Sequence, residues 1–133
     1  MVCIHCGSKT NIYNSRHQRR NNQVWRRRRC ISCGAIFTTT EQSDLSSNWL
    51  VLNKSEDITP FSSDKLMVSI YKSCRHRDRA LEEARSLTDT IVQKLASKIR
   101  NGQINVKDIS RFTQVALNRF DKAASTYYSV RHQ

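Results

Sequence analysis

Cys3-Ile4-His5-Cys6-Gly7 near the start of the chain is matched by Cys30-Ile31-Ser32-Cys33-Gly34, with 23 residues between the second and third cysteines. Two residues between paired thiolates let one tight turn direct both sulfurs at a single ion, and Zn²⁺ accepts four such ligands tetrahedrally. The glycine after each pair suits the positive φ that such a turn requires. The pattern therefore predicts one structural Zn²⁺ bound by Cys3, Cys6, Cys30 and Cys33.

Two other interpretations of these cysteines compete with the zinc site. A CxxC pair is also a redox motif, and four unrelated buried thiols are the plainest alternative. Two matched CxxC-Gly segments in a chain with five cysteines favour metal binding, because an odd count in a reducing cytosol does not predict disulfides. His5 is an alternative ligand, which we disfavour because the four thiolates already complete the shell.

The residues between and after the two cysteine pairs are expected to form a small antiparallel sheet. Residues 11–17 and 23–26 are predicted strands joined by the polar turn at 18–22, and 35–40 is β-branched and aromatic, which favours a third strand. The predicted fold of this part is a zinc ribbon. A sheet this small has little interior, so metal binding should supply much of its folding free energy.

A run of four arginines, Arg26 to Arg29, abuts Cys30. Side chains alternate along a strand, so only two of the four can share one face. Guanidinium groups bind phosphates and guanine edges in a forked geometry, which makes Arg16, Arg26, Arg27 and Arg28 the predicted DNA-binding residues. A solvated charge run is the alternative. Trp25 is expected to cap the thin core of the ribbon, with stacking on a base as the other interpretation.

The composition points to a polyanionic partner. Lys and Arg number 23 against 11 Asp and Glu, a formal net charge of +12, which favours nucleic acid over a membrane surface. The sequence contains no run of about 18 apolar residues and no signal-peptide pattern after Met1. We therefore expect a soluble cytoplasmic protein that associates with the nucleoid when it binds DNA.

The remainder of the chain is predicted to be mainly helical, which divides the sequence into 1–45 and 46–133. Residues 49–52 and 57–59 suggest a short hairpin that ends at Pro60. Apolar residues at helical spacing predict helices that begin near Ser62 or Ser63, at Ala80, near Asn105 and at Asp121. Cys74 is expected in the core. The predicted class is α+β, a zinc ribbon followed by a domain with two strands and about four helices.

Signatures of common enzymes are absent from the sequence. No GxGxxG, GxxxxGK[ST], HExxH or GxSxG segment occurs. We therefore predict no enzymatic activity and no catalytic residue. A thiol oxidoreductase and a nucleotide hydrolase are the enzyme alternatives, and no paired carboxylates or Mg²⁺-holding motif support the second.

Over essentially its whole length the chain resembles the NrdR-type transcriptional regulators of bacterial ribonucleotide reductase genes. The residues that carry the resemblance are the two CxxC pairs, Asn14-Ser15-Arg16, the basic stretch 24–28, and Phe37-Thr38-Thr39 with Glu41. In the second half, Pro60-Phe61, Lys65-Leu66 and Lys72 resemble the start of an ATP-cone domain, and residues 121–124 resemble its last helix. The chain departs from the family at Trp25, where an arginine is usual, and after Asn53-Lys54, where a glycine turn is missing.

This resemblance implies a zinc-dependent repressor that binds paired operator sites on double-stranded DNA. It implies that residues 46–133 bind ATP and dATP and form nucleotide-dependent homo-oligomers. The nucleotide-binding residues it suggests are Val51, Lys54, Lys65, Lys72 and Tyr128, with the lysines on the phosphates because a mobile point charge suits a triphosphate. Solvated surface lysines are the alternative for each. The competing function is a zinc-ribbon RNA-binding or ribosome-associated protein, which the positive charge also favours.

Overall fold

The computed structural model describes residues 1–132, which separate into two units, Met1–Ser43 and a second unit that begins at Asp44. The α+β class and the zinc ribbon followed by a mainly helical domain are confirmed. Along the described residues, no helix has both the length and the apolar character that a bilayer crossing requires.

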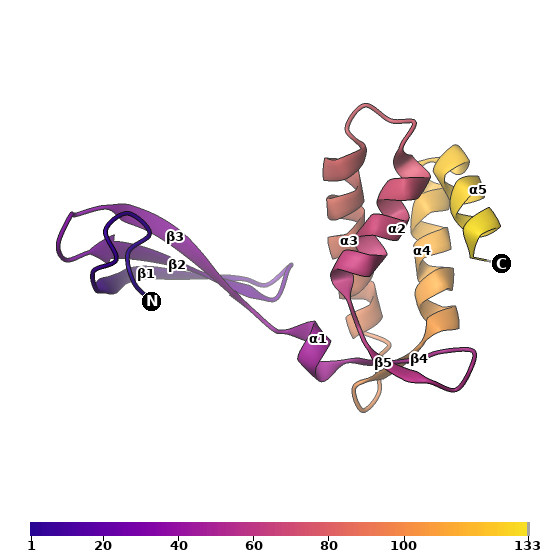
Figure 1. The fold of residues 1–133 in the computed structure, drawn as a ribbon, viewed down its shortest axis with the longest axis horizontal. Helices are drawn as coiled ribbons and strands as arrows, with labels where there is room; N and C mark the ends of the chain where they lie inside the picture. The colour runs from indigo at the N-terminus through magenta and orange to yellow at the C-terminus, as the bar shows by residue number, and fades with distance from the viewer. Residues whose placement is uncertain (133) are drawn as a thin grey trace. The chain divides into compact units, whose positions relative to one another are not determined.

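The first unit is a three-stranded antiparallel sheet in the order β1-β2-β3 (Figure 1). The strands are β1 (Thr10–Gln18), β2 (Gln23–Cys30) and β3 (Ile36–Gln42). The register of β1 on β2 shifts between Ile12 and Asn14, which leaves Tyr13 at a bulge. The strand positions agree with the alternation and turn residues of the sequence, apart from a β2 that extends through the arginine run to Cys30.

The second unit contains a small sheet that the sequence predicted only in part. Strands β4 (Leu50–Leu52) and β5 (Ile58–Pro60) form the expected antiparallel hairpin. A third strand, β6 (Gln103–Asn105), pairs with β4 in parallel, so the prediction of two strands was one short. Gly102 precedes β6 with φ of 70°. A Cβ there would meet the backbone oxygen of Asn48 at 2.8 Å, so the close approach of the two segments requires glycine.

Within residues 44–132 five helices complete the second unit, one more than predicted, and Figure 1 shows their arrangement. They are α1 (Leu45–Asn48), α2 (Ser63–Cys74), α3 (Ala80–Ala96), α4 (Val106–Phe120) and α5 (Lys122–Arg131). The additional helix, α1, is a single turn in the segment we expected to be a polar joint. It forms because the Asp44 carboxylate accepts hydrogen bonds from the amides of Ser46 and Ser47.

The predicted helix starts are confirmed by side-chain caps. Ser62 accepts from the Lys65 amide, Asn105 from the Lys107 amide, and Asp121 from the amides of Ala123 and Ala124. Each cap satisfies amides that have no partner inside the helix. Helix α3 has no side-chain cap and carries Glu82 and Glu83 in its first turn, where negative charge complements the helix dipole.

The core of the second unit lies among α2, α3, α4 and α5. Its fully buried side chains include Ile70, Ile91, Leu95 and Leu117. Cys74 is also completely buried, which confirms its core role, and desolvation raises the pKa of its thiol. Leu81 of α3 is 57% exposed, because the face that packs on α2 and α4 is the one through Ala84, Thr88, Ile91 and Leu95.

Candidate metal centre and nucleic-acid interface

Four sulfur atoms from two turns converge in the first unit. Cys3 and Cys6 belong to the turn before β1, Cys30 ends β2, and Cys33 lies in the turn before β3. All four Sγ atoms lie within 4.8 Å of one another, with Cys3 3.7 Å from Cys33 and Cys6 3.5 Å from Cys30. A tetrahedron with zinc–sulfur bonds of about 2.3 Å has edges of about 3.8 Å, so this cluster suits Zn²⁺.

Backbone amides hold the sulfurs in place. The amides of Ser32 and Cys33 both point at Cys30 Sγ over 3.4 Å, and the His5 amide points at Cys3 Sγ over 3.4 Å. Amide dipoles directed at sulfur favour its thiolate form, which is the form that binds metal. His5 contributes only this amide, because the metal-binding cluster found among residues 1–132 consists of the four predicted cysteines.

The glycines that follow the two cysteine pairs adopt the conformation that their place in the sequence predicts. Gly7 has φ of 74° and Gly34 has φ of 72°. No atom lies within 4 Å of a Cβ built at either position, so the need for glycine here is conformational and not steric. The Gly7 amide donates to the Cys3 carbonyl over 3.0 Å, which closes the first turn.

The four thiols respond unequally to one another. Hydrogen bonds from the side chain and then the amide of Ser8 lower the pKa of Cys6 to about 6. The Ala35 amide lowers the pKa of Cys33, but desolvation and the three neighbouring sulfurs outweigh it and raise that pKa to about 12. Crowding therefore opposes ionisation of the fourth thiol, and a divalent cation would supply the charge that all four thiolates require.

The arginines of β2 alternate between the two faces of the sheet. Trp25, Arg27 and Arg29 lie on one face, and Arg26 and Arg28 lie on the other, as alternation along a strand dictates. Cross-strand pairing extends each face over all three strands. The predicted DNA-binding residues are thus divided, with Arg16 and Arg27 on one face and Arg26 and Arg28 on the opposite face.

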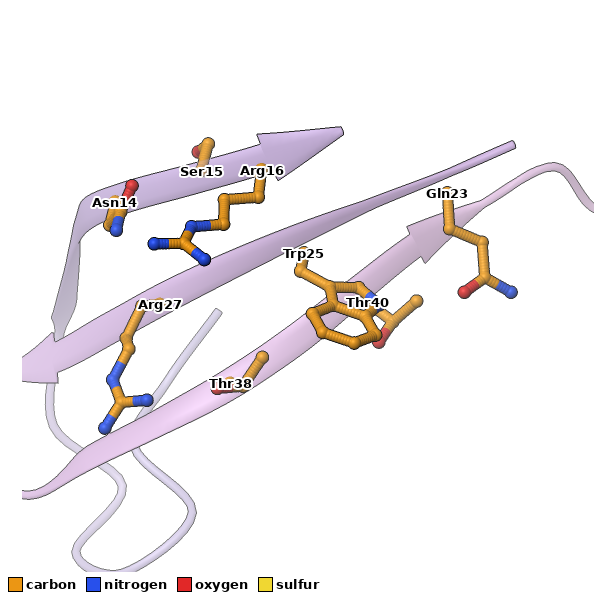
Figure 2. Close-up of a pocket in the computed structure, with 8 residues that line it drawn as sticks. All are labelled: Asn14, Ser15, Arg16, Gln23, Trp25, Arg27, Thr38 and Thr40. Carbon is orange, nitrogen blue, oxygen red and sulfur yellow. The ribbon is translucent and has the colours of Figure 1, made fainter. Parts of the chain in front are cut away.

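The face that carries Trp25 is hollowed into a groove of about 670 Å³ (Figure 2). Two cross-strand rows form most of it, Arg16-Trp25-Thr40 and Asn14-Arg27-Thr38, each with one residue from β1, β2 and β3. Gln23 and Ser15 complete the lining. Within residues 1–132 this lining contains no acidic side chain, so the groove is positively charged.

The opposite face holds its arginines in internal contacts. Arg26 donates from Nε and NH2 to Glu41 over 3.0 and 2.8 Å and from NH1 to Ser15 over 3.2 Å. Arg28 donates to the hydroxyls of Thr39 and Thr10. In contrast, Arg16 pairs with Trp25 through the backbone ladder, but its guanidinium has no hydrogen bond or ion pair with any described residue. The groove face therefore offers the freer guanidinium groups.

The expectation that Trp25 caps the core of the ribbon was wrong. Its side chain is 44% exposed and lies outside the one apolar core of the described chain, which belongs to the second unit. The reason is register, because position 25 shares a face with Arg27 and that face forms the lining of the groove. Figure 2 shows the indole of Trp25 beside Thr40, within the groove.

The second unit has a basic pocket between α2 and α5. Its lining comprises Lys65, Val68, Ser69, Lys72 and Arg75 from α2 and its C-cap, with Arg131 and His132 from the end of α5. Two of the five predicted nucleotide-binding residues, Lys65 and Lys72, are thereby brought together. The pocket has a volume of about 510 Å³ and carries four Lys or Arg side chains, which suits an anionic ligand.

Tyr128 lies behind this pocket. It is 97% buried, and its ring stacks on that of His132 with centroids 4.2 Å apart. His132 in turn lies 2.6 Å from the Ser69 hydroxyl, which joins the end of α5 to α2. Desolvation and the nearby Arg131 lower the pKa of His132. The other two predicted residues are not part of the pocket, since Val51 is buried in the core and Lys54 is exposed in the β4–β5 turn.

A second cluster of charges, which the sequence did not suggest, joins α3 to the start of α5. Arg77 donates to Glu83 over 2.6 and 3.0 Å and to Asp121 over 2.9 Å, and His76 lies 3.0 Å from Asp121. His76, then the Ala124 amide, then Arg77 lower the pKa of Asp121 well below its usual value. These contacts hold α3 and the start of α5 together.

Some of these residues could have been found from the sequence. Lys65, Ser69, Lys72 and Arg75 recur at helical spacing, which places them on one face of α2. Alternation around Trp25 predicts Gln23 and Arg27 as its neighbours. Arg131 and His132 had no such signal, because only the packing of α5 against α2 brings them to the pocket.

Comparison with known proteins agrees with both units. Residues 1–41 match the family described as "Transcriptional repressor NrdR-like, N-terminal domain", and residues 50–133 match the ATP cone domain. Among curated relatives named "Transcriptional repressor NrdR", that of Afipia carboxidovorans is 32% identical over 98% of this chain and 85% of its own length. That of Streptococcus gordonii is 30% identical over 98% and 86%. That of Symbiobacterium thermophilum is 33% identical over 74% of this chain and 65% of its own length, just under two thirds.

Proposed function

Because the chain belongs to the NrdR family of transcriptional repressors, we propose that it represses ribonucleotide reductase genes by binding their operator DNA under the control of ATP and dATP. Its relatives are named as regulators and not as enzymes. The first unit would bind DNA and one structural Zn²⁺ per subunit, and the second would bind the nucleotide and form homo-oligomers. Such a repressor acts in the cytoplasm, at the nucleoid.

The observation that carries this proposal is that one strand holds both the arginine run and a residue of the metal cluster. Strand β2 places its arginines in register and ends at Cys30, one of the four converging sulfurs. A metal bound there would fix the strand, so that the guanidinium groups meet phosphates without first being ordered. We assign phosphate contacts to Arg16, Arg26, Arg27 and Arg28, with Arg16 and Arg27 contributing most because Glu41 already occupies Arg26.

The basic pocket of the second unit supports the nucleotide part of the proposal. Lys65 and Lys72 line one site with Arg75 and Arg131, an arrangement that would neutralise a triphosphate. Tyr128 supports His132 from behind. Val51 and Lys54 are assigned to the nucleotide by resemblance to the ATP cone, and they lie on and beside β4.

Nucleotide control of DNA binding can be stated as a linkage. If dATP binds the DNA-competent assembly more tightly than the silent one, operator DNA must raise dATP affinity by the same factor. A surplus of deoxynucleotide would then switch off its own synthesis. Measuring the mass of the protein in solution with ATP, with dATP and without nucleotide tests whether the assembly responds.

The deciding experiment is a mobility shift on operator DNA at fixed salt, with ATP, with dATP or with neither. We expect the apparent affinity to depend on the nucleotide, and Lys65→Ala to reduce that dependence while the matched variant Lys98→Ala, exposed on the loop after α3, leaves it intact. Indifference to nucleotide would reject the sensing role. Failure to bind operator DNA at low salt would reject the repressor itself.

A separate measurement tests the DNA interface. Each arginine that contacts a phosphate should lower the slope of log affinity against log salt by about 0.9 when replaced by alanine. We expect this for Arg27→Ala and not for Arg85→Ala, an exposed arginine on α3 that removes the same charge from the other unit. Equal slopes for the two variants would place the interface elsewhere.

A further inference from the structure

The groove around Trp25 combines three chemical features that the proposed repressor function does not use together. Its floor carries an indole that is 44% exposed. Arg16 lies across from it on β1, and Arg27 lies two residues along β2 in the neighbouring row (Figure 2). Amide and hydroxyl groups of Asn14, Thr38 and Thr40 surround it.

The basic groups of the groove are available to a ligand. The guanidinium of Arg16 makes no hydrogen bond or ion pair within residues 1–132, and that of Arg27 uses only Nε, which donates to the Tyr13 hydroxyl over 2.9 Å. Gln23 donates to Gln42 over 2.8 Å and has its own amide oxygen left over. The groove thus presents free guanidinium nitrogens for phosphates and neutral polar groups for the edge of a base.

We propose that this groove binds single-stranded nucleic acid, with an unpaired base stacked on Trp25 and the adjoining phosphates on Arg16 and Arg27. A positively charged groove with an aromatic platform is how sequence-tolerant proteins bind single strands, because every base has a face that can stack. Duplex DNA can use the arginines of the groove but not its indole, since the bases of a duplex already cover one another's faces and present only their edges. A hollowed surface also encloses one strand more readily than it enters a duplex groove.

This binding goes beyond the operator function and rests on a residue that the resemblance did not explain. Trp25 presents an exposed aromatic face, which the operator contacts assigned to the arginines do not use. The shared ligand chemistry is an unpaired base in a phosphodiester strand. DNA and RNA are its two sources, and the sugar distinguishes them.

Tryptophan fluorescence gives a direct test, because the chain has two tryptophans. Trp49 lies in the other unit, edge-on to Phe61 with ring centroids 5.4 Å apart, so the zinc-loaded full-length Trp49→Phe protein reports on Trp25 alone. We expect oligothymidylate to quench this fluorescence at fixed salt. Trp25→Ala, in the otherwise native protein, should weaken oligothymidylate binding by roughly 5- to 150-fold, and Trp25→Phe should recover part of the loss.

Several outcomes decide whether the groove binds single-stranded nucleic acid. Oligouridylate of the same length binding more tightly than oligothymidylate supports the proposal with RNA as the source, and equal or weaker binding supports it with DNA as the source. A Trp25→Ala protein that keeps its zinc and binds oligothymidylate normally overturns it. A loss of duplex affinity as large as the loss of single-strand affinity also overturns it, because Trp25 is then a duplex contact. Operator binding in the native protein is measured separately, so failure here leaves the repressor function standing.

Discussion

The ribbon and the helical unit of this chain are stabilised by different means. Of residues 1–43, all of which the structure describes, only Cys3 and Cys30 are buried, and both are in the sulfur cluster. Within residues 44–132 the second unit buries fourteen apolar side chains in one cluster, among them Ile70, Ile91 and Leu117. The first unit thus lacks the apolar burial that drives folding in the second.

The comparison explains how a basic sheet can remain folded. Burying a single aliphatic side chain contributes about 1.5–3 kcal/mol, and the ribbon has none that is fully buried. Both of its faces are consequently free to carry arginines and an exposed tryptophan. Dependence on a metal leaves the surface of the ribbon available for binding, whereas the helices of the second unit must use one face for packing.

Removal of the metal should affect the two units most differently. A strong chelator, or Cys30→Ser, removes a contribution on the order of 10–16 kcal/mol and should unfold residues 1–43. The helical unit should keep its structure, because its core contains no metal-dependent element. Amide NMR spectra of the full chain would show collapse of the ribbon signals while those from residues 44–132 stay dispersed.

The fifth cysteine provides the control for this experiment. Cys74→Ala changes a thiol that is fully buried on α2 in the other unit, so the protein should retain one zinc per chain. A ribbon that stays folded after chelation would contradict the proposed division. So would a helical unit that unfolds together with it.

A cavity in the helical core should have the opposite effect. Ile91 is fully buried on α3, and Ile91→Ala should lower the free energy of unfolding of the second unit by about 2–5 kcal/mol. Zinc content and the ribbon signals should not change. Urea unfolding followed by Trp49 fluorescence in a Trp25→Phe background measures the loss, since Trp49 packs on the core of this unit.

The sequence predicted the elements whose signals are local. The cysteine spacing, the alternation of β1 to β3 and the caps at Ser62, Asn105 and Asp121 depend on residues a few positions apart, and all have the expected structure. Strand β6 escaped prediction because Gln103–Asn105 is three residues long and its pairing with β4 is a contact between distant segments. Local periodicity has no information on such pairing.

The same distinction applies to the candidate sites. The metal cluster was predictable because each pair of ligands lies within one turn. The environment of Trp25 was not, since burial depends on whether anything packs on its face of the sheet, and that is a property of the whole unit. The larger part of the basic pocket was visible as a stripe on α2, and the remaining part, at Arg131 and His132, required the position of α5.

Glycine substitutions offer a smaller and more discriminating comparison. Gly102→Ala should lower the free energy of unfolding of the second unit by about 2 kcal/mol or more, because a left-handed φ of 70° is combined with a contact of 2.8 Å to the Asn48 backbone oxygen. Gly7 has a similar φ but open space around a Cβ built there. Gly7→Ala should therefore lower the free energy of unfolding of the first unit by only about 1–2 kcal/mol. Paired urea and zinc-release titrations measure the two. Equal losses would show that the close approach near Gly102 relaxes freely.

The smallest predicted effect is the loss of stability in acid that depends on the Asp121 carboxylate. It distinguishes charge from packing as sources of stability in the second unit. Asp121 caps α5, and its carboxylate is held by His76 and Arg77. These partners depress its pKa in the folded state below the usual value of about 3.9. The charge therefore stabilises the fold at pH above about 3.9, and this contribution is lost as the pH falls from that value towards the lower folded pKa.

Asp121→Asn keeps an oxygen that can cap the helix but removes the charge. We expect a loss of about 1 kcal/mol at neutral pH and a weaker dependence of stability on pH below about 4 than in the native protein. Trp49 fluorescence during urea unfolding at several pH values reports this, since acid releases any bound metal from the ribbon without affecting that probe. An identical acid dependence in the two proteins would mean that the Arg77 and His76 contacts add nothing to the cap, and packing alone would then account for the stability of the second unit.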